Sequence, residues 1–326
     1  MERGPVFVAG LERSGTSLLY ALLASHPNIA MTRRTNLWRH FFNQHGDLAD
    51  LENLDRCLAT MRRYKRLAVL NLDFARLRRE FLAGERTYPR LFALLEGQVA
   101  ERMGRSRWGD KSLHTEHHAD DIFAAYPGAR ILHMIRDPRD RYASSYARWK
   151  VRRGGVGAGT GEWLASARLA RRNERRHPDR YLIVGYETLA TEPEASLARI
   201  CAFIDEPFTR GMLSMEGAPE FRQGGNSSYG KRDAGIISTG SIGRFRDVLS
   251  PRQITFIQML AGREMTSFGY EPEPVSLPLG QGLRLALFDV PVESAHLIVW
   301  RARERVRDRT GRPLPGYRLI DPGRAA

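Results

Sequence analysis

The segment from Gly10 to Leu19, GLERSGTSLL, has the residue types and spacing of an anion-binding loop. An apolar run ends at Gly10, and helical spacing of leucines begins after Ser17. A strand, a glycine-bounded loop and a helix amino terminus together direct backbone N–H groups at a phosphate. Loops that bind nucleoside triphosphates carry a lysine where this chain has Thr16, and the nearest cation here is Arg13. The loop therefore predicts an anion other than a triphosphate held with magnesium.

This loop offers three kinds of contact to such an anion. The backbone at Gly15 can approach a ligand closely, because glycine has no side chain to obstruct it. The hydroxyls of Thr16 and Ser17 can donate hydrogen bonds, and Arg13 adds a delocalised positive charge. The candidate binding residues are Arg13, Ser14, Gly15, Thr16 and Ser17.

A second candidate anion site follows a later apolar run, RILHMI, at residues 130–135. Arg136 ends this run, and Ser144 lies eight residues further on, which is about two turns along a helix. These two side chains could hold a second phosphate. The alternative is that Arg136 pairs with Asp137 or Asp140 and that Ser144 binds no ligand.

Together the two segments resemble the sulfotransferase family, which transfers a sulfuryl group from 3′-phosphoadenosine-5′-phosphosulfate (PAPS) to an acceptor. The resemblance covers most of residues 5–270 and is closest to the tyrosylprotein and bacterial branch. The sequence GLERSGTSLL looks like the 5′-phosphosulfate loop, with Arg13 at its basic position. The sequence IRDPRDRYASSY looks like the 3′-phosphate element, with Arg136 and Ser144 as its ligands.

Three more motifs extend the resemblance in the same order along the chain. The sequence WGDKS is similar to a segment whose lysine is catalytic, which makes Lys111 a catalytic candidate. The sequence VGYETLATEPEASLARICAFID implies that Tyr186 lies beside the adenine. The sequence SIGRFRDVLSP implies that Arg244 lies on the 3′-phosphate side, with Phe245 at the usual tryptophan position.

The resemblance implies an in-line transfer from the co-substrate PAPS to an acceptor hydroxyl, without a metal. Arg13 and Lys111 would then neutralise charge on the transferring group and the leaving nucleotide. A carbohydrate, a lipid or another small molecule could be the acceptor, and Arg33, Arg34 and Arg39 favour one that carries negative charge. The expected partners are PAPS or its product adenosine 3′,5′-bisphosphate (PAP) and this acceptor; the oligomeric state is left open.

One position departs from the family pattern. The related branch has a glutamate base 21 residues after the loop arginine, and this chain has Arg34 there. Either another residue is the base, or Arg33 and Arg34 bind an anionic acceptor, or the protein binds PAPS without efficient turnover. The candidate replacement bases are His40, His45 and, as first choice, His114, which lies three residues after Lys111.

Two further clusters offer alternatives to these roles. His114, His117 and His118 have a helical spacing compatible with zinc, but histidines near an anion site have simpler explanations, so no metal is expected. Ser227 and Ser228 in NSSYG could face the acceptor or lie in a hydrated loop.

Strand signals alternate with helical ones, which predicts an α/β fold with a central, mostly parallel sheet in a P-loop-containing three-layer arrangement. Strands are expected at residues 5–9, 130–135 and 180–186, each followed by a helix. The glycine-rich segment 154–161 predicts a surface loop.

The predicted domain organisation is a sulfotransferase-like α/β domain over residues 1–270, with a mostly helical insertion at 37–105. Residues 271–326 are expected to form a C-terminal helical extension packed on or beside the core. A dimer contact and a basic surface for lipid are the alternatives for this extension, and membrane-surface contact has only weak support because its charged and apolar residues do not separate cleanly.

The composition is that of a globular protein, with 42% hydrophobic and 27% charged residues. A net charge of +14, in which only four of the 51 basic residues are lysine, favours anionic ligands. Nucleic acid is not expected, because no basic cluster is interleaved with aromatics. Two distant cysteines and the lack of a signal peptide or an apolar run of about 20 residues predict a cytoplasmic protein.

A P-loop small-molecule kinase, and a PAP- or PAPS-binding protein with weak or no transferase activity, are the competing functions.

Overall fold

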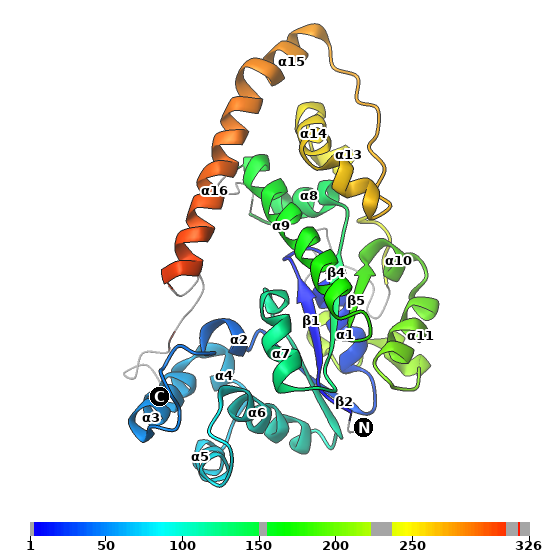
Figure 1. Cartoon of the computed structure of the whole chain (residues 1–326). Helices are drawn as coiled ribbons and strands as arrows, with labels where there is room; N and C mark the ends of the chain where they lie inside the picture. The colour runs from blue at the N-terminus through cyan, green and yellow to red at the C-terminus, as the bar shows by residue number, and fades with distance from the viewer. Residues whose placement is uncertain (1–2, 150–154, 223–236, 311–318, 320–326) are drawn as a thin grey trace.

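The computed structural model describes residues 3–149, 155–222, 237–310 and residue 319. Its centre is a five-stranded sheet with the order β2-β3-β1-β4-β5, in which every neighbouring pair is parallel. The strands are β1 (Val6–Gly10), β2 (Ile29–Arg33), β3 (Arg107–Lys111), β4 (Arg130–Ile135) and β5 (Tyr181–Gly185). Helices lie on both sides of this sheet (Figure 1). The predicted α/β fold with a parallel sheet is confirmed.

Alternating side chains of the strands separate the two faces of the sheet. Val6 and Val8 pack with α1 (Thr16–Ala24), α10 (Tyr186–Thr191) and α11 (Pro193–Phe203). The other face is covered by helices of residues 37–105 and by α7, α8, α9 and α14. These elements are α2 (Leu37–His40), α3 (Leu51–Arg63), α4 (Lys65–Ala68), α5 (Phe74–Leu82), α6 (Tyr88–Arg102), η1 (Thr115–His118), α7 (Ala119–Ala125), α8 (Pro138–Trp149), α9 (Gly155–Arg176) and α14 (Pro251–Ser267).

Two strands were missing from the sequence-based prediction. β2 and β3 both end in a basic residue, Arg33 and Lys111, and these two residues are partners in the sheet. Parallel strands are usually recognised by continuous apolar runs, and the charges in RWGDK conceal that pattern. Both strands place their carboxyl ends at the same edge as the loop after β1, which brings Lys111 to the candidate site.

The prediction of a surface loop at residues 154–161 was wrong, because residues 155–161 form the first two turns of α9. Glycines are needed there for close packing against α16 (Val290–Thr310): a Cβ on Gly157 would collide with the backbone of Glu293, and one on Gly161 with Leu297. Tertiary packing therefore overrides the low helix propensity of glycine.

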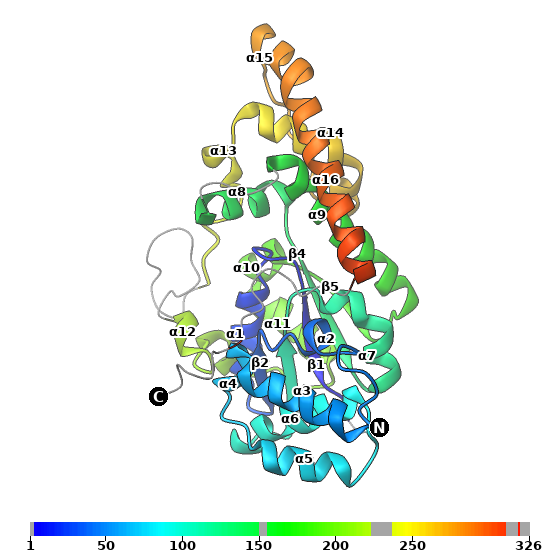
Figure 2. The same cartoon turned by 90° about the vertical axis from the view of Figure 1, so that its left-hand side faces the viewer.

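Residues 279–310 form a helical extension made of α15 (Leu279–Arg284), the π-helical turn η3 (Leu285–Asp289) and α16. α16 lies along α9 on one side of the molecule, and α15 projects beyond the sheet (Figures 1 and 2). Leu319 pairs with Tyr64 through an antiparallel bridge. The predicted boundary between a domain of residues 1–270 and an extension of residues 271–326 stays a prediction. None of the helices in the described part of the chain is long and apolar enough to span a bilayer.

The remaining short elements join these helices. They are η2 (Arg210–Ser214), α12 (Pro219–Arg222) and α13 (Phe245–Val248). Ser227 and Ser228, the serines considered for acceptor contact, lie outside the described residues.

Candidate active site

The loop between β1 and α1 has the backbone geometry expected of an anion-binding loop. Gly10, Arg13 and Gly15 all adopt positive φ, at 115°, 68° and 92°. For Arg13 this conformation is unfavourable, so the surrounding contacts must hold it in place. The helix α1 begins at Thr16 with no acidic residue in its first turn, which leaves the positive end of its dipole uncompensated. The loop can therefore accept an anion at this end.

Arg13 of the loop, Arg136 and Ser144, which the sequence analysis assigned to two distinct anion sites, are in direct contact in the folded chain. Arg13 Nε donates a hydrogen bond to Ser144 Oγ at 2.9 Å. Arg136 in turn donates through Nη1 to the backbone oxygen of Arg13 at 3.1 Å. The loop after β1 and the start of α8 are thereby joined into one structure by charged and hydroxyl groups.

Arg136 is buried yet makes no ion pair with the acids that follow it. Asp137 pairs with Arg139 at 2.6 Å, and Asp140 accepts backbone N–H groups from Gly243 and Phe245. No ion pair of Arg136 is found in the described part of the chain, and its Nε has no hydrogen-bond partner there. The alternative expectation, that Arg136 serves only to pair with a neighbouring acid, is therefore wrong. A buried donor without a partner fits a side chain that binds a ligand.

Tyr186 lies between Arg136 and the loop. The Arg136 guanidinium is 4.5 Å from the centre of the Tyr186 ring, and Tyr186 Oη is 2.6 Å from Ser241 Oγ. A side chain on Gly15 would collide with this ring, so only glycine fits at that position. Tyr186 is held at the edge of the candidate anion site by an aromatic face contact and a hydroxyl contact.

Arg244 is positioned by an acid that the sequence analysis did not identify as part of the site. Asp140 accepts from Gly243 N at 2.7 Å and from Phe245 N at 2.9 Å, which holds the residues on both sides of Arg244. The guanidinium of Arg139 lies 4.4 Å from the Phe245 ring centre. The only sequence signal for Asp140 was its place in the motif IRDPRDRYASSY.

Lys111 lies at the carboxyl end of β3 with only 5% of its surface exposed. Burial is the largest cause, and the positive charge of Arg34 the next, of a pKa for Lys111 that is lowered to about 8, although the charges of Asp110 and Glu12 act to raise it. The backbone N–H of Arg34 donates to the Lys111 backbone oxygen at 2.8 Å, which fixes the two residues side by side.

Arg34 itself has a backbone in the left-handed region, with φ 60°. Its pKa is lowered by burial and by the charges of Arg66 and Arg33. Arg33 is paired with Glu220 at 3.3 Å, whereas the Arg34 side chain has no hydrogen bond or ion pair within the described residues. Positive charge is thus concentrated beside Lys111.

Buried acids under this region also escaped the sequence analysis. Thr32 Oγ1 lies 3.0 Å from Glu96 Oε1 and 3.1 Å from Asp110 Oδ1. Burial raises the pKa of both carboxyl groups, and the Asp110 charge raises that of Glu96 further. Glu96 comes from α6, far away in sequence, so only the folded chain reveals this contact.

Among the three histidines considered as bases, His114 is the one at the end of β3. It adopts positive φ (67°) just before η1. Burial lowers the pKa of both His40, to about 4, and His45, and their rings lie against Tyr64 and Phe41 in the helical insertion.

The histidine cluster considered for zinc has a different membership in the folded chain. The ligand atoms of His114, Glu116 and His117 all lie within 4.8 Å of one another. His118 instead pairs with Asp121 at 3.5 Å. Glu116 is buried and accepts the backbone N–H of Gly10 at 3.2 Å, so this acid supports the start of the anion-binding loop.

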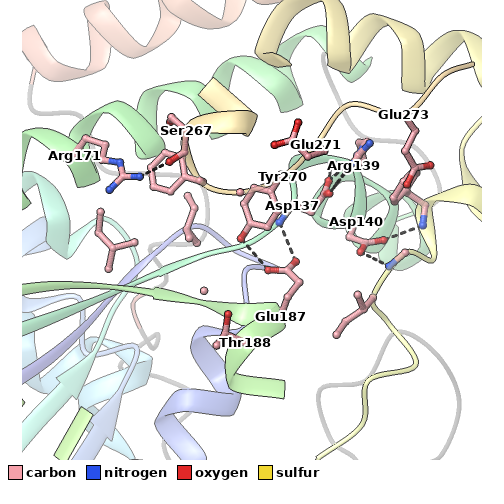
Figure 3. A pocket seen from close by; sticks show the side chains of 18 of the residues that line it. Asp137, Arg139, Asp140, Arg171, Glu187, Thr188, Ser267, Tyr270, Glu271 and Glu273 are labelled. Atoms are coloured by element: carbon pink, nitrogen blue, oxygen red, sulfur yellow. Dashed lines mark hydrogen bonds and ion pairs between the residues drawn. The ribbon is translucent and has the colours of Figure 1, made fainter. Parts of the chain in front are cut away.

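A cavity of about 890 Å³ lies near the ends of β4 and β5 (Figure 3). Its lining includes Asp137, Glu187 and Tyr270, and the Glu187 carboxylate accepts from Asp137 N at 3.0 Å and from the Tyr270 hydroxyl at 2.8 Å. None of the predicted site residues lines this cavity. Its internal hydrogen bonds instead stiffen the segment that follows Arg136.

Comparison with known proteins agrees with this geometry. The model of a family described as the sulfotransferase family matches residues 5–210. No curated protein sequence matches the chain.

Several solved structures share the fold. The sulfotransferase domain of the olefin synthase from Synechococcus PCC 7002 is 21% identical with a TM-score of 0.55, over 85% of this chain and 97% of that one. The sulfotransferase domain from the curacin biosynthetic pathway is 17% identical with a TM-score of 0.56, over 83% of this chain and 99% of that one. The family model matches more than half of the residues of this chain, so the chain belongs to the sulfotransferase family.

Proposed function

We propose that this protein transfers a sulfuryl group from PAPS to an acceptor hydroxyl. The observation that carries the proposal is the hydrogen-bonded link from Ser144 through Arg13 to Arg136, which joins two anion-binding elements. PAP carries phosphates at both its 3′ and 5′ positions and therefore needs two such elements. The loop of residues 13–17 would hold the 5′ side, and Arg136, Ser144 and Arg244 the 3′ side.

In the proposed reaction the acceptor oxygen bonds to sulfur while the bond from sulfur to the bridging phosphate oxygen breaks. PAP leaves with that electron pair, and the hydroxyl proton passes to a base. Charge spreads over the peripheral oxygens during transfer, so fixed cations supply much of the catalysis. Arg13 and Lys111 have this role, and Tyr186 borders the adenine. The proposed reaction uses no metal.

We assign the base to His114. It follows Lys111 at the edge where the strand ends meet, and an imidazole can accept a proton near neutral pH. Arg34, at the position expected for a glutamate base, cannot accept one. It would bind the acceptor, which we take to be a carbohydrate, a lipid or another small molecule.

A PAP- or PAPS-binding protein with little transfer is the second candidate function, and the same Arg34 favours it. A small-molecule kinase has less support, because Thr16 stands where a triphosphate loop has its lysine. We also propose the cytoplasm as the location. The free thiols Cys57 and Cys201 are buried, as expected for structural thiols in a reducing compartment.

Thermal denaturation with PAP, compared with ADP and magnesium, tests the nucleotide assignment. PAP should raise the melting temperature and MgADP should not, because ligand binding stabilises the folded state by mass action. Stabilisation by MgADP alone would contradict the proposal. Transfer of labelled sulfate from PAPS to a panel of hydroxyl compounds then separates the enzyme from the binding protein.

A further inference from the structure

Three side chains that can bind a metal ion meet just beyond the carboxyl end of β3. The ligand atoms of His114, Glu116 and His117 all lie within 4.8 Å of one another. In a tetrahedral zinc site, bonds of about 2.0–2.2 Å place neighbouring ligand atoms about 3.3–3.6 Å apart. A small movement therefore separates the three side chains from a shared ion. Two imidazoles and one carboxylate are also a donor set that suits zinc.

The turn that carries these residues brings both imidazoles to one side. η1 is a 3₁₀ helix, in which residues three apart lie above one another. His114 immediately precedes η1, and the backbone N–H of His117 donates to its backbone oxygen at 3.1 Å. The two ring centres are 5.7 Å apart. The spacing of the two histidines is therefore set by the backbone.

This turn is held in place by several contacts. η1 packs against β1 and α9. Thr115 Oγ1 donates to the backbone oxygen of Ser112 at 2.9 Å, and Asn173 Nδ2 donates to that of Glu116 at 2.8 Å. His114 keeps its positive φ, an unfavourable conformation that persists only where the surrounding structure imposes it. The ligands are therefore positioned before any ion arrives.

Glu116 supplies the observation that points to a ligand. Only 1% of this residue is exposed. Its Oε2 accepts the backbone N–H of Gly10, but its Oε1 has no hydrogen-bond partner in the described part of the chain. A buried polar atom without a partner has lost water and gained nothing in return, which costs free energy that a bound cation would offset. Among the described residues, the side chains of His114 and His117 have no hydrogen bond or ion pair either.

We propose that His114, Glu116 and His117 bind one zinc ion, with water as the fourth ligand. An open fourth position is typical of zinc sites with three protein ligands. His117 is exposed, so its side chain can turn to close the remaining distance while Glu116 stays in place. His118 is not a ligand, because it pairs with Asp121 at 3.5 Å. Magnesium matches the site poorly, since it prefers oxygen ligands.

Zinc at this place opposes sulfuryl transfer. This consequence rests on the proposed function, in which His114 takes the proton of the acceptor hydroxyl. A neutral imidazole has one nitrogen with a free lone pair and one nitrogen with a proton. Zinc bound to the lone pair leaves no nitrogen to accept a proton, so the ion inhibits the base and takes no part in the reaction. The contact of Glu116 Oε2 with Gly10 can persist, because Oε1 is available for the ion.

Calorimetric titration of the full-length protein with zinc, after treatment with a chelator, tests the site. One zinc ion should bind per chain, and magnesium should not bind. His117→Ala and Glu116→Gln should each weaken zinc binding at least about tenfold, since even substitutions behind a metal ligand commonly cost that much. Glutamine keeps an acceptor for the Gly10 N–H, so loss of binding in Glu116→Gln reports on the carboxylate and not on the loop.

His118→Ala is the matched control for this titration. It removes the neighbouring histidine of the same turn and should bind zinc as the wild type does. Absence of zinc binding in the wild type, or equal binding by the wild type and His117→Ala, overturns the proposal. An equal loss of binding in His117→Ala and His118→Ala overturns it as well, because the ligand set would then be wrong.

Transfer of labelled sulfate from PAPS tests the inhibition. Saturating zinc should stop transfer by the wild type, and a chelator should restore it. His117→Ala should transfer within a few-fold of the wild type and should be insensitive to the same zinc concentration. Zinc that binds without slowing transfer would overturn the inhibition and remove His114 as the base.

Melting curves with PAP separate the zinc site from the nucleotide assignment. PAP should raise the melting temperature by the same amount with and without zinc, because the two ligands use different residues. A protein that PAP stabilises but zinc does not bind loses only the zinc site. A protein that binds zinc but is not stabilised by PAP loses the nucleotide assignment, and with it the inhibition.

Discussion

The proposed nucleotide side and the proposed acceptor side of the site differ in the contacts that their positively charged side chains make. The nucleotide side consists of Arg13, Arg136, Ser144 and Tyr186, which are connected to one another and to Ser241. The acceptor side consists of Arg34, Lys111 and His114. Within the described residues, the side chains of Arg34 and Lys111 have no hydrogen bond or ion pair.

This difference indicates what each side requires of a ligand. The nucleotide side is already assembled, so PAPS would enter a site whose side chains need little rearrangement. On the acceptor side, like charges lie close together and two residues adopt positive φ. Such strain persists because the surrounding fold imposes it, and an anion bound here would offset the repulsion between the like charges. Transfer should therefore be more sensitive than nucleotide binding to changes on the acceptor side.

The largest effect is expected for Lys111→Ala. Removing a cation that stabilises transition-state charge should lower kcat about 10³-fold while leaving the affinity for PAP within a few-fold. Single-turnover transfer of labelled sulfate and calorimetric titration with PAP measure the two quantities. Lys65→Ala, on the insertion, is the matched control and should transfer normally. A loss of PAP affinity as large as the loss of kcat would remove the distinction between the two sides.

His114→Ala should lower kcat about 10²-fold, the lower end of the range for a general base. His117→Ala, three residues away and exposed, should stay within a few-fold of the wild type. If the two substitutions have equal effects, His114 is not the base and the acceptor side must obtain it elsewhere.

Lys111→Met should increase the free energy of unfolding at pH 7 by about 1–3 kcal/mol, because a buried charge is removed. The pKa of Lys111 is about 8 in the folded protein and ordinarily 10.5. Below pH 8 the side chain is therefore charged in both the folded and the unfolded wild type, and the variant's gain in the free energy of unfolding is complete. The gain should fade between pH 8 and 10.5, as the folded wild type loses its proton first. Urea denaturation at several pH values checks this, and a gain that grows with pH contradicts it.

The smallest expected effect is a displacement of the pH profile. Transfer should decline as pH rises through about 8, because Lys111 loses its charge. Arg34→Ala removes a neighbouring positive charge, so the pKa of Lys111 rises and the alkaline limb of kcat/KM should move to higher pH. An unchanged or lowered limb would show that Arg34 does not act on Lys111.

The segments of the proposed nucleotide side could be picked out from the sequence because their signals are local. The apolar run before Gly10, the loop and the following helix form one contiguous segment, as do the run 130–135, Arg136 and Ser144. The structure then brought these segments together, since the carboxyl ends of β1 and β4 meet at one edge of the sheet.

The acceptor side was less predictable because its environment is tertiary. The charged strand β3 does not show the apolar pattern of a buried strand, and the short strand β2 was not recognised, so the adjacency of Arg34 and Lys111 was not foreseen. Glu96 reaches Thr32 from another helix, and Asp140 acts on a segment about 100 residues later in the chain. No local pattern encodes such contacts.

The central claim is that two separate anion positions receive the two ends of one nucleotide. Titration calorimetry with PAP and with adenosine 5′-phosphate, on the wild type and on Arg136→Ala, tests it most directly. The wild type should bind PAP at least about tenfold more tightly, because the 3′-phosphate gains charge-assisted hydrogen bonds. In Arg136→Ala this preference should nearly disappear. An equal affinity of the wild type for both nucleotides, or a preference that survives in the variant, would contradict the account.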